Sequence, residues 1–276
     1  MKWVGLVTVL ICGCLLLFVT KDFPAWGDPS SPASTHLSPH FIEKGLQETG
    51  APNLVTAVLA DYRGYDTLFE AVVVFCAGMA LLLLLRESQR KRQQSIYYRH
   101  IPTEVTLHIK DPSRAPRETE DLERIDTLWV PFDIILKTVC RILIPFIQIF
   151  ALYVIAHGEA SPGGGFQGGV IFGASLILLS LSFDLRSVLK NINEVWLGFV
   201  CALGILIYAG IGVLCMFLGG NFLDYSKLSL VLPVDATHAR ALGMMGVEIG
   251  VGFIVMAVMV MIYLNLSSDG RLDEGL

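Results

Sequence analysis

The sequence predicts an all-α membrane protein with about six transmembrane helices, arranged as a two-helix unit, a charged linker and a four-helix unit. Of its 276 residues, 54% are hydrophobic and only 16% are charged, and the mean hydropathy is +0.62. Soluble domains carry about 25% charged residues, so this composition indicates a lipid environment. The hydrophobic residues also form long blocks, as membrane spans require.

Five of these blocks reach or approach the roughly 20 apolar residues that cross a bilayer. They are residues 3–19, 68–85, 165–183, 195–220 and 241–266. A sixth block, 142–156, is short. It spans the bilayer if its helix begins near residue 132 and the side chains of Lys137 and Arg141 reach back to the headgroups. Contact of these two cations with an acidic group on a neighbouring subunit is the alternative.

The distribution of cations predicts the orientation. Nine of the twenty Lys and Arg residues lie in the stretch 86–124. The positive-inside rule places this stretch, and with it both termini, in the cytoplasm of a protein of the inner (cytoplasmic) membrane. The block that follows Lys2 also fits a signal peptide. It is longer than a usual signal core, so we expect a retained helix.

These features divide the chain into four predicted parts. Residues 1–86 form a two-helix unit with a long outer loop, and residues 87–130 form a charged cytoplasmic linker. Residues 131–266 form the four-helix unit, and residues 267–276 form a cytoplasmic tail.

Two of the connecting segments carry local patterns. The outer loop opens with a Pro- and Ser-rich stretch, residues 21–39, that is typical of an extended chain. Near its end, apolar residues at a spacing of three to four over 54–59 predict a short amphipathic helix on the outer membrane face. In the linker, alternation over 104–109 predicts one short strand, and we expect the remainder to be solvated.

The stretch 157–169, HGEASPGGGFQGG, literally satisfies a G-x-G-x-x-G nucleotide fingerprint. Membrane spans precede and follow it, and no lysine followed by serine or threonine completes a phosphate loop, so the match is accidental. A spacing of four is more informative, because it lines one helix face with small residues and lets another helix approach closely. This spacing relates Gly165, Gly169 and Gly173 on the fourth helix, and Gly246 and Gly250 on the sixth. The other residues of this dense cluster, which form the turn and the start of the fourth helix, are Pro162, Gly163, Gly164, Phe166 and Gly168.

Three stretches resemble known membrane proteins. Residues 157–169 resemble the signature of the B subunit of multisubunit (Mrp-type) sodium/proton antiporters, and residues 238–262 are similar to the last helix of that family. Residues 51–70, APNLVTAVLADYRGYDTLFE, resemble the C-terminal end of the large A subunit of these antiporters. A similar piece occurs as a separate small protein, MbhE, in membrane-bound hydrogenase complexes.

The resemblance implies an accessory membrane subunit of a sodium/proton antiporter module, without a catalytic centre of its own. Its partners would be the other membrane subunits and the lipid bilayer. No cofactor, nucleotide or nucleic acid is expected, only transported Na⁺ and H⁺. One alternative is the same module within a membrane-bound hydrogenase or a related ion-pumping oxidoreductase. Another is a self-sufficient small transporter or scaffold, although two intramembrane carboxylates are few for a complete antiporter.

The two intramembrane carboxylates are the first candidates for an ion path, because an ionisable side chain in hydrocarbon usually faces protein or water. Glu248 lies in the sixth block, where it is either a protonatable relay or cation ligand, or a hydrogen-bonded residue of a packed interface. Glu70 follows Thr67 by three residues. This spacing is also that of a capping box, which explains the glutamate without an ion path.

Three further candidates lie at the outer rim. Asp61 and Asp66 are close to Arg63 in sequence, and these three side chains could pair among themselves. His157 follows the third helix, where it either responds to the outside pH or caps the helix C-terminus.

The six cysteines lie in or beside apolar blocks without a C-x-x-C pair. We therefore expect small buried hydrophobic side chains and no metal site.

Overall fold

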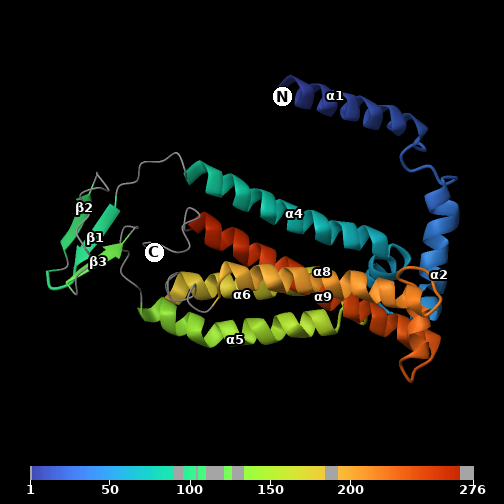
Figure 1. Cartoon of the computed structure of the whole chain (residues 1–276). Coiled ribbons are helices and arrows are strands. Elements are labelled where there is room, and N and C mark those ends of the chain that lie inside the picture. Colours follow the sequence, from blue (N-terminus) through green and yellow to red (C-terminus); the bar gives the residue numbers. More distant parts are fainter. Residues whose placement is uncertain are drawn as a thin grey trace. The chain divides into compact units, whose positions relative to one another are not determined.

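The computed structural model describes residues 2–89, 96–103, 105–109, 121–125, 134–183 and 192–267 (Figure 1). Much of the predicted linker and the predicted tail after residue 267 lie outside these ranges. Within them, six helices are long and apolar enough to cross a membrane, which confirms the expected all-α membrane fold. The chain forms two compact units, Met1–Gly45 and Leu46–Leu276.

The first unit contains α1 (Lys2–Val19), the short turn η1 (Thr20–Asp22), the π-helix η2 (Ala33–Leu37) and the start of α2 (Ser38–Thr49). The stretch expected to be extended therefore becomes helical at Ala33. Pro32 directly precedes the first helical turn, where the fixed φ of proline suits helix initiation and its missing N–H has no intrahelical partner to lose.

In the second unit, α3 (Leu54–Thr56) and the π-helix η3 (Ala57–Tyr62) lead into α4 (Gly64–Gln89). The short helix predicted near residue 54 is present. Ala57 and Ala60 are buried, whereas Leu54 and Val55 are exposed. Small side chains let this segment lie close against the bundle, and its larger apolar side chains face outward.

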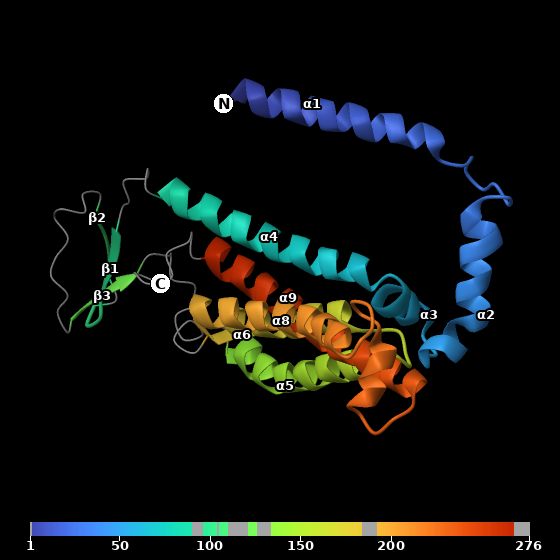
Figure 2. The ribbon, with the colours of Figure 1, turned by 45° about the vertical axis from the view of Figure 1, so that its right-hand side comes forward.

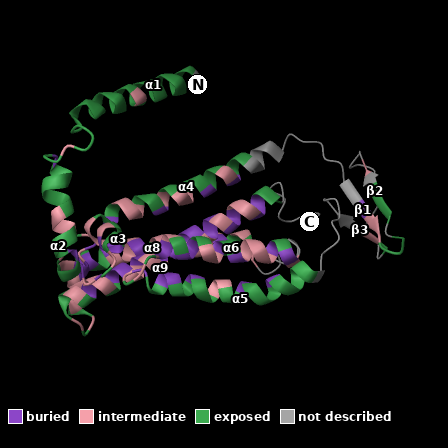
Figure 3. Ribbon diagram, turned by 180° about the vertical axis from the view of Figure 1, so that it is seen from behind, coloured by how far each residue is buried: buried purple, intermediate pink, exposed green. Residues whose placement is uncertain are grey.

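Four helices form the bundle: α5 (Ile134–Ala156), α6 (Gly165–Phe183), α8 (Glu194–Phe217) and α9 (Ala236–Ser267). The 3₁₀ turn η5 (Tyr225–Leu230) lies between α8 and α9. Helix α9 is central, since it packs against α4, α6 and α8 (Figure 2). It is also the most deeply buried of the six long helices (Figure 3).

Small residues bring these helices together. A Cβ placed on Gly169 of α6 would lie 2.8 Å from the carbonyl oxygen of Gly252 in α9. On another face of α9, a Cβ on Gly250 would lie 2.8 Å from the carbonyl oxygen of Gly204 in α8. Helix α9 therefore presents one small-residue face to α6 and another to α8, which explains how it can be surrounded on several sides.

Three short strands form an antiparallel sheet in the order β2-β1-β3. They are β1 (Ile96–His100), β2 (Val105–Ile109) and β3 (Leu122–Ile125). Only β2 matches the predicted strand. The central strand β1 reads IYYRH, which suits a pleated surface, but β3 reads LERI and depends on its pairing with β1.

Candidate functional site

The turn between α5 and α6, residues 157–164, is bound by a segment that lies about 100 residues earlier in the chain. The side-chain amide of Asn53 donates to the carbonyl oxygens of Gly158 and Ser161, both at 2.9 Å. Its side-chain oxygen accepts from the backbone N–H of Val55 at 3.0 Å and so caps α3. One asparagine thus starts a helix and binds the turn.

Thr56 supplies a further donor to the same turn. Its hydroxyl donates to the carbonyl oxygen of Gly158 at 2.6 Å, and the side chain is buried. The backbone N–H of Asn53 also donates to the carbonyl oxygen of Glu159 at 2.9 Å. The backbone carbonyls of Gly158, Glu159 and Ser161 are therefore satisfied by the segment that begins at Asn53.

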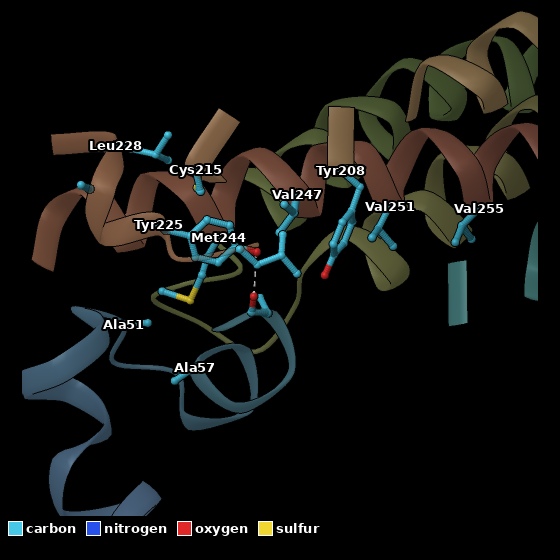
Figure 4. Close-up of a cluster of buried hydrophobic side chains, with 13 residues drawn as sticks. Ala51, Ala57, Tyr208, Cys215, Tyr225, Leu228, Met244, Val247, Val251 and Val255 are labelled. Carbon is cyan, nitrogen blue, oxygen red and sulfur yellow. Dashed lines mark hydrogen bonds between the residues drawn. The ribbon is translucent and has the colours of Figure 1, made fainter. Parts of the chain in front are cut away.

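Two buried tyrosines bind backbone carbonyls farther along the same segment, at Ala60 and Gly64. The hydroxyl of Tyr208 in α8 donates to the carbonyl oxygen of Gly64 at 2.7 Å. The hydroxyl of Tyr225 in η5 donates to the carbonyl oxygen of Ala60 at 3.0 Å, shown as a dashed line in Figure 4. Burial raises the pKa of the Tyr225 phenol, so this group stays a neutral donor.

An ion pair completes the set of contacts made by residues 53–64. The guanidinium of Arg240 in α9 donates from Nε and Nη2 to the two carboxylate oxygens of Asp61, both at 2.7 Å. The side chain of Asp61 is only 7% exposed. Arg63 pairs with Asp66 instead, and both of these side chains are well exposed. We call the contacts of Asn53, Thr56, Ala60, Asp61 and Gly64 with the bundle the clasp.

Beneath the clasp lies a cavity of about 240 Å³. The structure brings Glu70 of α4 and Glu248 of α9 to its wall, so the two predicted intramembrane carboxylates share one space. Its other polar lining groups are Thr56, Thr67, Gln167 and Tyr208, and Phe166 contributes an aromatic wall. A cavity of this size and polarity has room for water molecules beside the carboxylates.

The glycine-rich turn is built around Glu248. A Cβ placed on Gly158 would collide with the Glu248 carboxylate, and one on Gly164 would lie 2.9 Å from its Oε1 atom. A Cβ on Gly165 would collide with the backbone carbonyl oxygen of Glu248. Gly164 also adopts a φ of +128°, which other residues rarely adopt. The turn therefore needs glycine because a carboxylate and a helix backbone lie directly against it.

The capping-box interpretation of Thr67 and Glu70 is wrong. Helix α4 begins at Gly64, so Thr67 already lies inside the helix. Its hydroxyl donates to the carbonyl oxygen of Leu59 at 2.8 Å. Glu70 consequently sits in the second turn of α4, on the cavity wall.

Of the remaining predicted residues, Gly163 lines the cavity, whereas His157, Lys137, Arg141, Pro162 and Gly168 lie outside its wall. His157 is exposed; its ring stacks on Tyr153 with centroids 4.2 Å apart, and Nδ1 lies 3.2 Å from the Tyr153 carbonyl oxygen in the last turns of α5. Lys137 lies at the other end of α5 with Nζ 5.4 Å from the centre of the Phe183 ring, and Arg141 is exposed. Pro162 and Gly163 lie in the turn, while Gly168 packs against α5.

Three cysteines are buried as expected, namely Cys140, Cys201 and Cys215, whereas Cys12, Cys14 and Cys76 lie on the surfaces of their helices. Among the described residues, no group of three or more His, Cys, Asp and Glu side chains is placed to hold a metal ion.

Sequence reasoning did not find Asn53, Thr56, Tyr208, Tyr225 or Arg240. For Tyr208, Tyr225 and Arg240, the available sequence signal was a polar side chain within or beside an apolar block. The partners of all five lie more than 100 residues away. No local spacing links such residues, so their roles appear only when the segments dock.

Comparisons with known proteins identify both halves of this arrangement. A family model described as a domain related to the MnhB subunit of Na⁺/H⁺ antiporter matches residues 135–261, and the MbhE model, which describes a component of MBH, matches residues 10–100. The putative antiporter subunit mnhB2 of Staphylococcus aureus (strain Newman) is 31% identical over 136 residues, which are 49% of this chain and 94% of the relative. This chain belongs to the MnhB family. The resemblance expected from residues 157–169 and 51–70 is thereby confirmed, and the clasp joins the MbhE-like segment to the MnhB domain.

Solved structures with the same fold belong to membrane complexes. The Mrp complex from Dietzia sp. DQ12-45-1b contains a chain that matches 99% of this one with 25% identity and a TM-score of 0.59. The present chain spans about a quarter of that longer chain, 26% of its length. A chain of the membrane-bound sulfane sulfur reductase, an archaeal respiratory membrane complex, shares the fold with a TM-score of 0.55 at 23% identity, over 99% of this chain and 98% of that one.

Proposed function

We propose that this multi-pass membrane protein is an accessory subunit of a multisubunit cation/proton antiporter module, in which Glu248 and Glu70 contribute to an ion path. The observation that carries the proposal is the shared cavity, since carboxylates from α4 and α9 line the same space. The family relation to antiporter subunits supports the transported ions, Na⁺ and H⁺, as the cargo.

The chemistry of the cavity suits such a cargo. Carboxylate, hydroxyl and amide oxygens are hard ligands, and the carboxylates can also carry a proton. The Thr56 hydroxyl, which donates to the Gly158 carbonyl oxygen, also lies within hydrogen-bonding reach of the Glu248 side chain. A cation or water in the cavity would suit the charged form of Glu248.

The clasp supports an accessory role. It joins the MbhE-like segment to the MnhB domain through an ion pair and several hydrogen bonds, which makes the chain a rigid piece on which other subunits can assemble. In this proposal the chain has no catalytic centre, lies in the inner membrane and has both termini in the cytoplasm. Thiol-reagent accessibility of single cysteines placed at the two ends of α1 tests that orientation.

A second candidate is the same module within a redox-driven complex. The match to the MbhE model and the fold shared with the sulfane sulfur reductase favour it. Purifying the native complex decides between the two. Co-purifying iron–sulfur subunits would support the redox-driven module, and a complex of membrane subunits alone would support a stand-alone antiporter.

The decisive variant for an ion-path role is Glu248→Gln, which removes the titratable group and keeps the side-chain size. In vesicles containing the native complex, we expect loss of sodium-dependent proton exchange with the complex still assembled. Glu43→Gln on α2 makes the same chemical change at an exposed position outside the cavity and should leave exchange unchanged. Normal exchange by Glu248→Gln in a fully assembled complex would contradict the ion-path role.

A further inference from the structure

We propose that Asn53 and Thr56, on the MbhE-like segment, are positioning residues for the Glu248 carboxylate of the MnhB domain. This inference rests on the proposed function of Glu248 and adds how its geometry is set. Asn53 would act through the 157–164 turn, whose carbonyl oxygens it binds. Thr56 binds the same turn, and its hydroxyl also lies within hydrogen-bonding reach of Glu248.

The first step of the argument is that the turn is held from outside the MnhB domain. Two donors, the Asn53 amide and the Thr56 hydroxyl, converge on the carbonyl oxygen of Gly158. The other amide contact fixes Ser161 three residues later. Because a carbonyl oxygen has two lone pairs, Gly158 accepts both donors without competition. The turn is thus fixed at two points along its length.

The second step is that the fixed points lie directly against Glu248. The Glu248 carboxylate is so close to Gly158 that a Cβ there would collide with it, and such a Cβ would also lie 2.7 Å from the Cα of Gly164. Gly164 in turn lies against the other carboxylate oxygen. The carboxylate therefore has backbone of the turn directly against both of its oxygens, and a shift of the turn changes its surroundings.

A purely structural role for Asn53, as the cap of α3, predicts a different result. Capping uses the side-chain oxygen, which accepts from Val55, whereas positioning uses the amide hydrogens. Asn53→Ser keeps a good capping residue but is too short to reach both carbonyls. Asn193 caps α8 in the same way, accepting from the N–H of Trp196 at 2.7 Å, so Asn193→Ser is a matched control.

Neutral substitutions are required because other charged or titratable groups face Glu248. Glu70 on α4 and Tyr208 on α8 share the cavity, and Glu159 of the turn is close enough to act electrostatically. Asn53→Asp would add another negative charge there, so an effect on exchange could come from the altered electrostatic field at Glu248 or from a shift of the turn. Thr56→Val removes the hydroxyl at nearly constant shape, and Thr56→Ser restores it.

The test measures exchange by the native complex in vesicles as a function of Na⁺ concentration. We expect Asn53→Ser and Thr56→Val to raise the half-saturating Na⁺ concentration by about tenfold, as for one or two lost hydrogen bonds. Asn193→Ser should match the unmodified complex, and Thr56→Ser should recover most of the exchange lost in Thr56→Val. If Asn53→Ser and Thr56→Val behave normally while Glu248→Gln abolishes exchange, the proposed function stands and the positioning role is wrong.

A second readout does not depend on transport. Glu248→Cys is introduced alone or together with Asn53→Ser or Asn193→Ser, and thiol-reagent labelling at position 248 is followed by peptide mass spectrometry. Release of the turn should raise the labelling rate severalfold with Asn53→Ser and leave it unchanged with Asn193→Ser. Equal rates in all three would overturn the positioning role, whatever Glu248→Gln does to exchange.

Discussion

At the scale of single residues, the glycines of this chain fall into groups that differ in what surrounds them. Gly158 and Gly165 face a carboxylate and a helix backbone, and a side chain at either position would collide with them. Gly198 and Gly210 on α8 have open space where a Cβ would lie. At both positions of the first group, backbone atoms of Gly164 or Glu248 stand where a Cβ would lie, whereas the second group leaves room for other residues.

This difference predicts opposite outcomes for the same substitution. Gly158→Ala should lower the thermal stability of the complex and strongly reduce exchange, because the new methyl group meets both the Glu248 carboxylate and the Gly164 backbone. Gly198→Ala should be neutral or slightly stabilising, by up to about 1 kcal/mol, because alanine is the better helix former. Melting temperature and exchange rate of the two purified complexes check this. A normal Gly158→Ala complex would show that the turn can move away from Glu248.

At the scale of elements, long-range docking decided what the sequence could predict. The six spans follow from runs of apolar residues, because a bilayer demands length and hydrophobicity that are visible locally. The start of α4 was misplaced because η3 ends at Tyr62 and α4 begins at Gly64, which moves Thr67 into the helix. Glu70 and Glu248 could be proposed as single candidates, but their shared cavity requires the three-dimensional packing of α4 on α9.

The ion pair of the clasp belongs to the same scale, since it joins η3 to α9. Arg240→Ala leaves the carboxylate of Asp61, which is 7% exposed, without its partner. The expected cost is several kcal/mol, on the order of 3, in the free energy of unfolding. Arg63→Ala breaks a pair whose side chains are 62% and 45% exposed, and it should cost about 1 kcal/mol or less. Denaturant titration of the purified chain measures both.

The double variant Asp61→Leu with Arg240→Met distinguishes the net contribution of the ion pair from the cost of leaving the Asp61 carboxylate unpaired. Replacing both charges with apolar side chains removes the unpaired carboxylate, so much of the stability lost in Arg240→Ala should return. Equal destabilisation by Arg240→Ala and Arg63→Ala would mean that Asp61 finds water or another partner when Arg240 is removed.

At the scale of the whole molecule, one polypeptide carries segments that match two family models, residues 10–100 and 135–261. The clasp is accompanied by a shared hydrophobic core, in which Ala57 and Ala60 pack with Tyr225 and Met244 (Figure 4). Two surfaces that already fit through an ion pair, hydrogen bonds and buried apolar area do not need a covalent connection to find each other in a membrane. The connection should raise only their effective concentration.

This reasoning predicts that the chain still assembles after it is cut. Residues 1–128 and 129–276, co-expressed as separate polypeptides without other members of the complex, keep the sheet on one piece and should co-purify through an affinity tag on either piece. Combining Arg240→Ala with Asn53→Ser should greatly reduce recovery of the untagged piece, because both changes remove polar contacts across the joint. Arg63→Ala, which breaks only a local exposed pair, should not. If the two pieces separate even when unmodified, the linker holds the segments together and the clasp forms only because they are tethered.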